Sequence, residues 1–376
     1  MTPELVAQSL WSLVPVASRA RYIRRAAVAM LDELDDLARV LAEATGWPRA
    51  HVVLSELLPA ARGLHALADQ GPRALADRRV IPRAAWLAGR STRLVRSPVG
   101  VVGVRGPSAS PWCEPVLETA ASLLAGNAVL LAAGAAGRVR GVFLRAGVPG
   151  ELVTVIDAEG DLEERCHRVV DLPPPNRLGT LLVLEGAPRE QVVEAALWAA
   201  FGGHATAAGR LVTVEGAVPG LLAALEQAAA QLEETIGPPE VVVIGPDDPQ
   251  FLAPTGSTLA VVEAPDADTA VRLASRGTRD APISVWARDR AKGERVARRL
   301  PSPATWVGHY GEERPNVEAR LARHAVLRQL EWRAPWAPQV PHDVATRVAL
   351  SELRHGRESR RWPALRALTR ASRRSR

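Results

Sequence analysis

Lysine and cysteine are the residues that this sequence has least of. Lys292 is the single lysine and arginine supplies every other basic side chain, a bias that we attribute to a GC-rich genome. Cys113 and Cys166 are too few for a disulfide-stabilised fold. There is no run of eighteen apolar residues, so we expect no transmembrane helix, and the N-terminus lacks the layout of a secretion signal. These absences predict a cytoplasmic protein.

The composition is otherwise that of an ordinary globular chain. Hydrophobic residues make up 47% and charged residues 23% of the sequence. The length of 376 residues suffices for two or three domains with buried cores. The eight histidines show no spacing typical of metal ligands, so we expect no metal site.

The positive charge of the chain is concentrated at its C-terminal end. Residues 354–376 hold nine arginines and one acid, Glu358. The net +8 of this tail exceeds the +6 of the whole chain and leaves residues 1–353 at −2. We therefore expect binding to nucleic acid or to an acidic surface only through the tail, where Trp362, Leu365 and Leu368 interrupt the arginines.

The N-terminal part predicts helices. Apolar residues recur at helical spacing over 16–45, and Gly46 and Pro48 end this pattern. A second helical stretch runs over 51–68. A polar, arginine-rich passage then leads to Pro98.

The middle of the sequence alternates between strand and helix patterns. Apolar runs over 99–104, 128–131 and 151–156 predict buried strands, and helical patterns over 115–125 and 136–146 lie between them. The alternation resumes beyond the prolines at 173–175. Strand–helix–strand units with short connections predict parallel sheets.

The second half extends the same pattern and suggests where the chain divides. We expect strands over 181–184, 211–214, 241–244, 259–262 and 283–286, and helices over 190–201, 221–232, 268–276 and 291–300. From Gly311 onward the sequence looks helical and is rich in arginine. The predicted parts are a Rossmann-like lobe with N-terminal helices (1–180), a catalytic-type α/β lobe (181–310) and a helical C-terminal segment with its tail (311–376).

Several segments resemble, in the same order, motifs of the aldehyde dehydrogenase superfamily. Residues 98–104, PVGVVGV, are similar to the family's Pro-x-Gly-Val-x-x-x-Ile strand. Residues 125–129, AGNAV, and 146–150, AGVPG, are similar to its Gly-Asn-x-Val and Ala-Gly-x-Pro segments. The resemblance covers roughly residues 15–310. It implies an α/β, aldehyde-dehydrogenase-like fold of two lobes with parallel-type sheets, and helical N- and C-terminal segments.

The family's nucleophile segment, Gly-Gln-x-Cys-x-Ala-x-x-Arg, is similar to residues 202–210, which read GGHATAAGR. Ala205 takes the place of the nucleophile and Arg210 that of the last residue. A methyl group has no lone pair with which to attack a carbonyl. The resemblance therefore implies a family member without the catalytic thiol.

Other family positions with a chemical role are changed as well. The asparagine that stabilises the oxyanion corresponds to Ala109 in the segment that begins at Pro107, and alanine has no side-chain donor. The general base falls near Pro174. The cofactor's ribose contacts correspond to Ala132 and to the segment around Gly256, and the Phe-Thr-Gly-Ser segment over the pyrophosphate is missing. By resemblance the cofactor would be NAD or NADP, yet these degenerate positions predict no retained contact to it.

We therefore predict a catalytically inactive member of the family, a pseudoenzyme with a binding or scaffolding role. The partners considered are a second copy of the chain, a paralogous active subunit, or a small metabolite in the vestigial cleft.

Two other hypotheses stay open. One is an NAD(P)-dependent oxidoreductase that acts on an aldehyde or acyl thioester through non-standard residues. Cys113 begins a helix, where the pKa of a thiol falls, and His204 lies beside the empty nucleophile position, although a structural role is the simpler interpretation of each. The other is an interaction protein that uses the arginine-rich tail 354–376.

Overall fold

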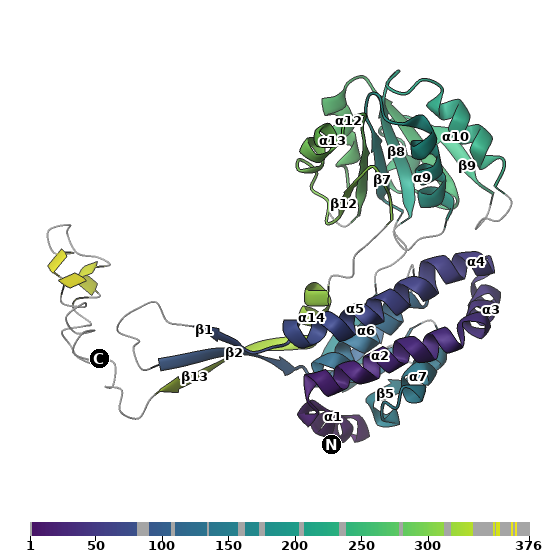
Figure 1. The fold of residues 1–376 in the computed structure, drawn as a ribbon. Helices are drawn as coiled ribbons and strands as arrows, with labels where there is room; N and C mark the ends of the chain where they lie inside the picture. Colours follow the sequence, from purple (N-terminus) through teal and green to yellow (C-terminus); the bar gives the residue numbers. More distant parts are fainter. Residues whose placement is uncertain are drawn as a thin grey trace.

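The computed structural model describes most of the chain. The described residues are 2–80, 90–106, 110–133, 135–156, 162–172, 177–202, 207–232, 238–277, 281–311 and 317–333, together with 349, 351–353, 362–363 and 365–366. Figure 1 shows two α/β lobes and an extended arm.

The chain begins with a layer of helices. They are α1 (Pro3–Leu13), α2 (Val16–Asp32), α3 (Leu34–Thr45), α4 (Arg49–Val52), the π-helical turn η1 (Val53–Leu57) and α5 (Leu58–Ala74). The single helix expected over 16–45 is wrong in one respect, because Glu33 (φ −108°, ψ 19°) leaves the helical conformation and separates α2 from α3. Gly46 ends α3 in the left-handed conformation (φ 72°), as glycine often does at a helix C-terminus.

The first lobe is built on a four-stranded parallel sheet in the order β5-β4-β3-β6. The strands are β3 (Val101–Arg105), β4 (Ala128–Ala132), β5 (Val153–Val155) and β6 (Arg168–Asp171), with α6 (Cys113–Ala125), α7 (Ala136–Arg145), a 3-10 turn η3 (Gly150–Leu152) and α8 (Leu162–Arg165) between them. β3 and β4 are almost wholly buried and α6 is buried along nearly its whole length, because it lies between the sheet and the N-terminal helices. The sequence analysis did not predict β6.

The second lobe carries a six-stranded parallel sheet in the order β12-β11-β7-β8-β10-β9. Its strands are β7 (Gly179–Val183), β8 (Ala208–Val214), β9 (Glu240–Val243), β10 (Thr258–Ala264), β11 (Ile283–Trp286) and β12 (Thr305–Val307). The helices are α9 (Arg189–Phe201), α10 (Leu221–Ala229), α11 (Pro249–Leu252), α12 (Ala267–Ala274) and α13 (Arg290–Ala297). Separate apolar clusters cover the two faces of the sheet, one with α9 and α10 and one with α12. The expected fold, α/β with parallel sheets in two lobes, is confirmed.

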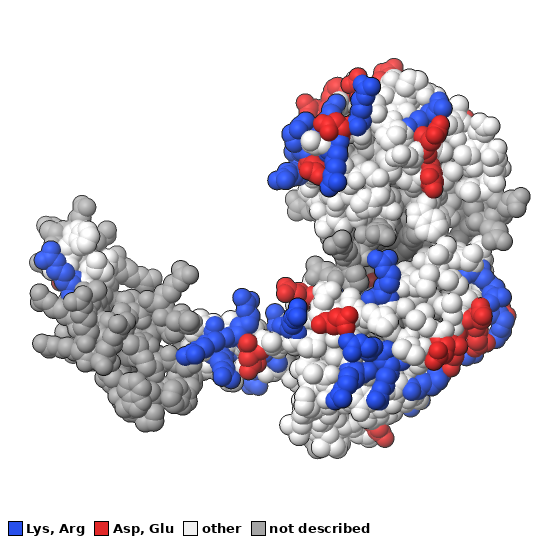
Figure 2. Space-filling view, in the orientation of Figure 1, with Lys and Arg blue, Asp and Glu red and all other residues white. Residues whose placement is uncertain are grey.

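The arm is an antiparallel sheet of three strands, β1 (Arg78–Val80), β2 (Arg90–Pro98) and β13 (Ala325–Arg333), in that order. The expectation that the chain is helical from Gly311 onward is wrong over 325–333, because β13 pairs with β2 along nine residues. This partner lies more than two hundred residues earlier, so no local pattern could reveal it. Exposed Arg78, Arg79, Arg93 and Arg328 give the arm its basic surface (Figure 2).

Helix α14 (Val317–His324) returns the chain from the second lobe to the first, where it packs against α5 and α6. The first lobe is therefore assembled from both ends of the described chain, with β13 continuing directly from α14 into the arm.

Candidate functional site

Most positions that the sequence analysis assigned to the family's chemistry lie outside the described residues. These are His204 and Ala205 in 203–206, Pro107 and Ala109 in 107–109, and Pro174 in 173–176. The tail 354–376 lies outside as well, apart from residues 362–363 and 365–366. The site must therefore be built from the elements that lead into these segments.

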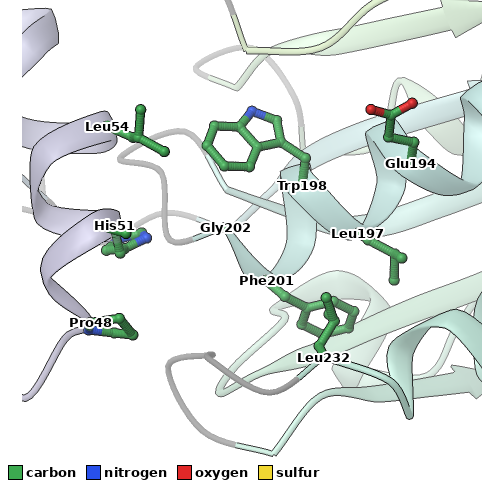
Figure 3. Close-up of a pocket in the computed structure, with 10 residues that line it drawn as sticks. Pro48, His51, Leu54, Glu194, Leu197, Trp198, Phe201, Gly202 and Leu232 are labelled. Atoms are coloured by element: carbon green, nitrogen blue, oxygen red, sulfur yellow. The ribbon is translucent and has the colours of Figure 1, made fainter.

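An apolar pocket of about 450 Å³ lies between the two lobes, beside the predicted nucleophile segment. The first lobe contributes residues of α4 and η1, and the second lobe contributes the C-terminal half of α9. The lining residues are Pro48, Ala50, His51, Leu54, Glu194, Leu197, Trp198, Phe201, Gly202 and Leu232. In Figure 3 the indole of Trp198 reaches from α9 toward Leu54 of the first lobe. A volume of this size is typical of sites for small molecules.

Two polar side chains, those of His51 and Glu194, interrupt this apolar lining. Ser55 Oγ donates a hydrogen bond to the carbonyl oxygen of His51 (2.7 Å) and lies 3.1 Å from His51 Nε2. Glu194 is exposed on α9, one turn before Trp198. Apart from a protonated His51, it is the one residue among the ten that carries a charge.

The pocket was not predicted from the sequence. Trp198 is 40% exposed although α9 packs on the sheet, and an exposed tryptophan beside leucine on a helix is the signal that could have drawn attention to it. The other wall lies about 150 positions earlier in the chain, and only the fold brings the two together.

Arg210, which the resemblance aligns with the last position of the nucleophile segment, has structural contacts. Its guanidinium donates to Thr180 Oγ1 (3.0 Å), the carbonyl of Arg276 (2.7 Å) and the carbonyl of Leu178 (2.7 Å). The guanidinium carbon also lies 5.2 Å from the centre of the Phe251 ring. Burial lowers the pKa of Arg210 to about 10. The side chain ties β8 to neighbouring segments of its own lobe.

Cys113 does not lie in the pocket. It is buried at the first turn of α6, where its backbone N–H donates to Glu56 Oε2 (2.8 Å). The same oxygen accepts from Ser110 Oγ (2.7 Å) and from the N–H of Trp112 (2.9 Å). Glu56 is fully buried, and this burial raises its pKa to about 7 against the opposing effect of these donors. The carboxyl thus caps the N-terminus of α6.

Cys166 lies in the first lobe, against β3. Its sulfur lies close to Gly103, where an added Cβ would be 3.1 Å from Sγ. Burial raises the pKa of the Cys166 thiol to about 11. Neither cysteine is among the ten residues of the interlobe pocket.

The first sheet changes its direction of strand addition between β3 and β6, the place where doubly wound folds bind dinucleotides. Arg105 ends β3 there and Asp171 ends β6, and Arg105 Nε donates to Asp171 Oδ1 at 2.7 Å. A second pair joins Arg105 Nη2 to Glu163 at 3.0 Å. Both carboxylates are about 70% exposed (70% and 69%) and would repel a pyrophosphate.

The described family positions for the cofactor provide no polar side chain. Ala132 ends β4 and is nearly buried, and Gly256 stands in open space with φ +62°. Among the described residues β6 is the single strand beyond the switch point, whereas a dinucleotide fold has a second βαβαβ half there. The described residues at these positions offer no side chain that could hydrogen-bond to the ribose of NAD.

Within the described residues, no group of three histidine, cysteine, aspartate or glutamate side chains is arranged to hold a metal ion. None of the helices described is both long and apolar enough to cross a bilayer.

Parts of the chain are similar to known aldehyde dehydrogenases. The model of the "Aldehyde dehydrogenase family" matches residues 5–166. A 4,4'-diapolycopene aldehyde oxidase of Methylomonas sp is 32% identical over 131 residues, which are 35% of this chain and 25% of that protein. A succinate-semialdehyde dehydrogenase [NADP(+)] of Deinococcus radiodurans is 25% identical over 80% of this chain and 79% of its own length. The matched segments thus span only a quarter of the first relative, but most of the second.

Solved structures agree on the fold. A NAD-dependent benzaldehyde dehydrogenase from Corynebacterium glutamicum superposes with a TM-score of 0.74 at 18% identity, over 88% of this chain and 87% of the other. PnpE in complex with nicotinamide adenine dinucleotide gives a TM-score of 0.78 at 16% identity, over 91% and 90%. These superpositions show that the chain has the fold of the aldehyde dehydrogenases, and the part of it that matches the model of that family is residues 5–166.

Proposed function

We propose that this family member does not oxidise aldehydes by thiol chemistry and instead binds a small ligand between its lobes. The observation that carries the proposal is the position of the two thiols. The resemblance places Ala205 at the nucleophile position. The two cysteines of the sequence both lie in the first lobe. The backbone of Cys113 donates to Glu56, and the sulfur of Cys166 lies against β3. An enzyme without an activated nucleophile loses the covalent step of the reaction.

The surroundings of the first sheet support the absence of nicotinamide chemistry. Arg105, Asp171 and Glu163 form ion pairs at the switch point, where the carboxylates oppose a bound pyrophosphate. The sheet has one strand beyond this point among the described residues. We therefore propose that NAD and NADP bind weakly or not at all.

The pocket supports the retained binding role. Its walls are apolar and come from both lobes, so a bound molecule would stabilise the lobes relative to one another. This distinguishes a ligand-binding protein from a scaffold that merely keeps the fold.

The test combines cofactor binding and turnover. Calorimetric titration of NAD and of NADP into the purified protein is expected to show no binding at millimolar nucleotide, and a panel of aldehydes is expected to produce no reduced nicotinamide. Ala205→Cys is the informative variant. It should stay inactive, because the oxyanion donor, the base and the ribose contacts are also absent from their family positions. Turnover by the unmodified chain, or tight binding of either nucleotide, would overturn the proposal.

A further inference from the structure

The chemistry of the interlobe pocket selects one class of ligand. From its lining we propose that the pocket binds a hydrophobic amine, that is, an alkyl- or arylammonium ion. The inference rests on the proposed binding role of the pocket and names the molecule that the site would accept.

The charge of the lining points to a cation. Among the described residues neither lysine nor arginine lines the pocket, whereas Glu194 carries a carboxylate at its edge. Glu194 is exposed and takes part in no ion pair with another residue that the structure describes. A carboxylate near an apolar cavity favours a ligand with a positive head group and repels carboxylates and phosphates.

Helix α9 adds a second negative pole. Phe201, its last residue, and Gly202, its C-cap, both line the pocket, so this helix of 13 residues directs its C-terminus into the cavity. The backbone carbonyls at a helix C-terminus carry a partial negative charge that attracts cations. Arg177 already donates to one of these carbonyls, that of Ala200 (2.9 Å), but it is not among the lining residues.

The aromatic and aliphatic walls account for the apolar body of the ligand. Trp198 presents an indole that is 40% exposed, one turn after Glu194 on the same helix. Residues four apart lie on one face of a helix, so a cation near Glu194 would also lie near the indole. Indole is the aromatic ring that attracts cations most strongly. Leu54, Leu197 and Leu232 then surround the chain or ring that carries the amine.

The experiment uses three probes with the same eight-carbon chain, namely octylammonium, 1-octanol and octanoate, titrated into the full-length protein by calorimetry. We expect octylammonium to bind about tenfold more tightly than octanol, the combined effect of one partly exposed carboxylate and one cation–π contact. Octanoate should bind least. Glu194→Gln should weaken octylammonium and leave octanol unchanged, so that only the part of the preference due to the cation–π contact with Trp198 remains.

Two control variants separate charge from general damage to the helix. Glu190→Gln removes an acid from the first turn of α9 that does not line this pocket, and it should leave the preference intact. Trp198→Leu should weaken octylammonium more than octanol. Equal affinity for the amine and the alcohol, tightest binding of octanoate, or no binding of any probe would overturn this inference. Nucleotide titration and aldehyde turnover are measured separately, so a failure of the proposed non-catalytic role remains distinguishable.

Discussion

His324 Nε2 lies 2.5 Å from Oε2 of Glu118, and the two side chains are 0% and 1% exposed where α14 meets α6. Oε1 of the same carboxylate pairs with Arg320 (2.5 Å) and Arg323 (2.8 Å). One buried anion therefore receives three basic side chains of a single helix. This contact fixes the returning helix, and with it the start of β13, on the first lobe.

Removal of the Glu118 carboxylate should destabilise the fold strongly. Glu118→Ala leaves the buried His324 without its partner, although Arg320 keeps its pair with Glu114, and breaking a buried pair in this way typically costs about 3–5 kcal/mol. Arg24→Ala is the control, since it breaks an ion pair whose members are 49% and 62% exposed and should cost less than about 1 kcal/mol. Urea unfolding measures both. If Glu118→Ala were as stable as the control, the buried pair would not hold α14.

The pH dependence of the Glu118 contribution has a definite sign. Burial opposes ionisation, but the hydrogen bond from His324 and the charge of Arg320 outweigh it and lower the pKa of Glu118 below its ordinary 4.5. A carboxyl with a lowered pKa contributes stability above its unfolded pKa and loses it as the pH falls. Glu118→Gln keeps the volume of the side chain. The difference in unfolding free energy between wild type and this variant should therefore shrink below about pH 4.5.

Glu56 should show the opposite dependence. Its pKa is raised from 4.5 to about 7, mainly by burial, so the fold favours the protonated form. Its contribution is present below pH 4.5 and is lost as the pH rises through 7, a difference of about 3 kcal/mol. Glu56→Gln keeps an oxygen for the Ser110, Trp112 and Cys113 donors. In urea titrations, the unfolding free energy of this variant relative to wild type should rise as the pH increases from 5 to 8. A fall over the same range would refute the assignment.

Gly209, the neighbour of Arg210 in β8, should tolerate no side chain. A Cβ added there would come within 2.4 Å of Pro254 and 2.6 Å of the carbonyl oxygen of Arg177. Gly209→Ala must therefore shift backbone and should cost about 2 kcal/mol or more. Gly137 is the matched control, because it lies in α7 with no atom within 4 Å of an added Cβ. Gly137→Ala should be neutral or stabilise by up to about 1 kcal/mol. Thermal unfolding of the two variants measures this difference, and equal melting temperatures would contradict the prediction.

The sequence was informative where structure is local. The runs over 128–131 and 283–286 lie within β4 and β11 because buried parallel strands read as short apolar runs between turns. The prediction of a helix over β13 was wrong, because these residues are stabilised by pairing with β2, more than two hundred positions earlier, and not by a local pattern. Pairing over such a distance leaves no periodic signal in a single sequence.

The candidate site was accessible to sequence reasoning only in part. The resemblance predicts the nucleophile position at Ala205, which lies outside the described residues, and the pocket next to Gly202 depends on residues as far apart as His51 and Trp198. The role of Arg210 could not be foreseen either, because its three acceptors lie on Thr180, Leu178 and Arg276. Arg210, which the resemblance aligns with a catalytic motif, holds three segments of its lobe together.

The reactivity of the two thiols tests the proposed loss of thiol catalysis. Cys113 is buried, and burial raises the pKa of Cys166 from 9.0 to about 11. Only the thiolate reacts, so near neutral pH Cys166 should be labelled about a hundredfold more slowly than an unperturbed thiol by the same disulfide reagent. Unfolding in urea should release both thiols at the ordinary rate. Cys166→Ser assigns the slow phase, and Cys113→Ser assigns any remainder. Rapid labelling of Cys113 in the native protein, protected by an aldehyde, would instead revive it as a nucleophile.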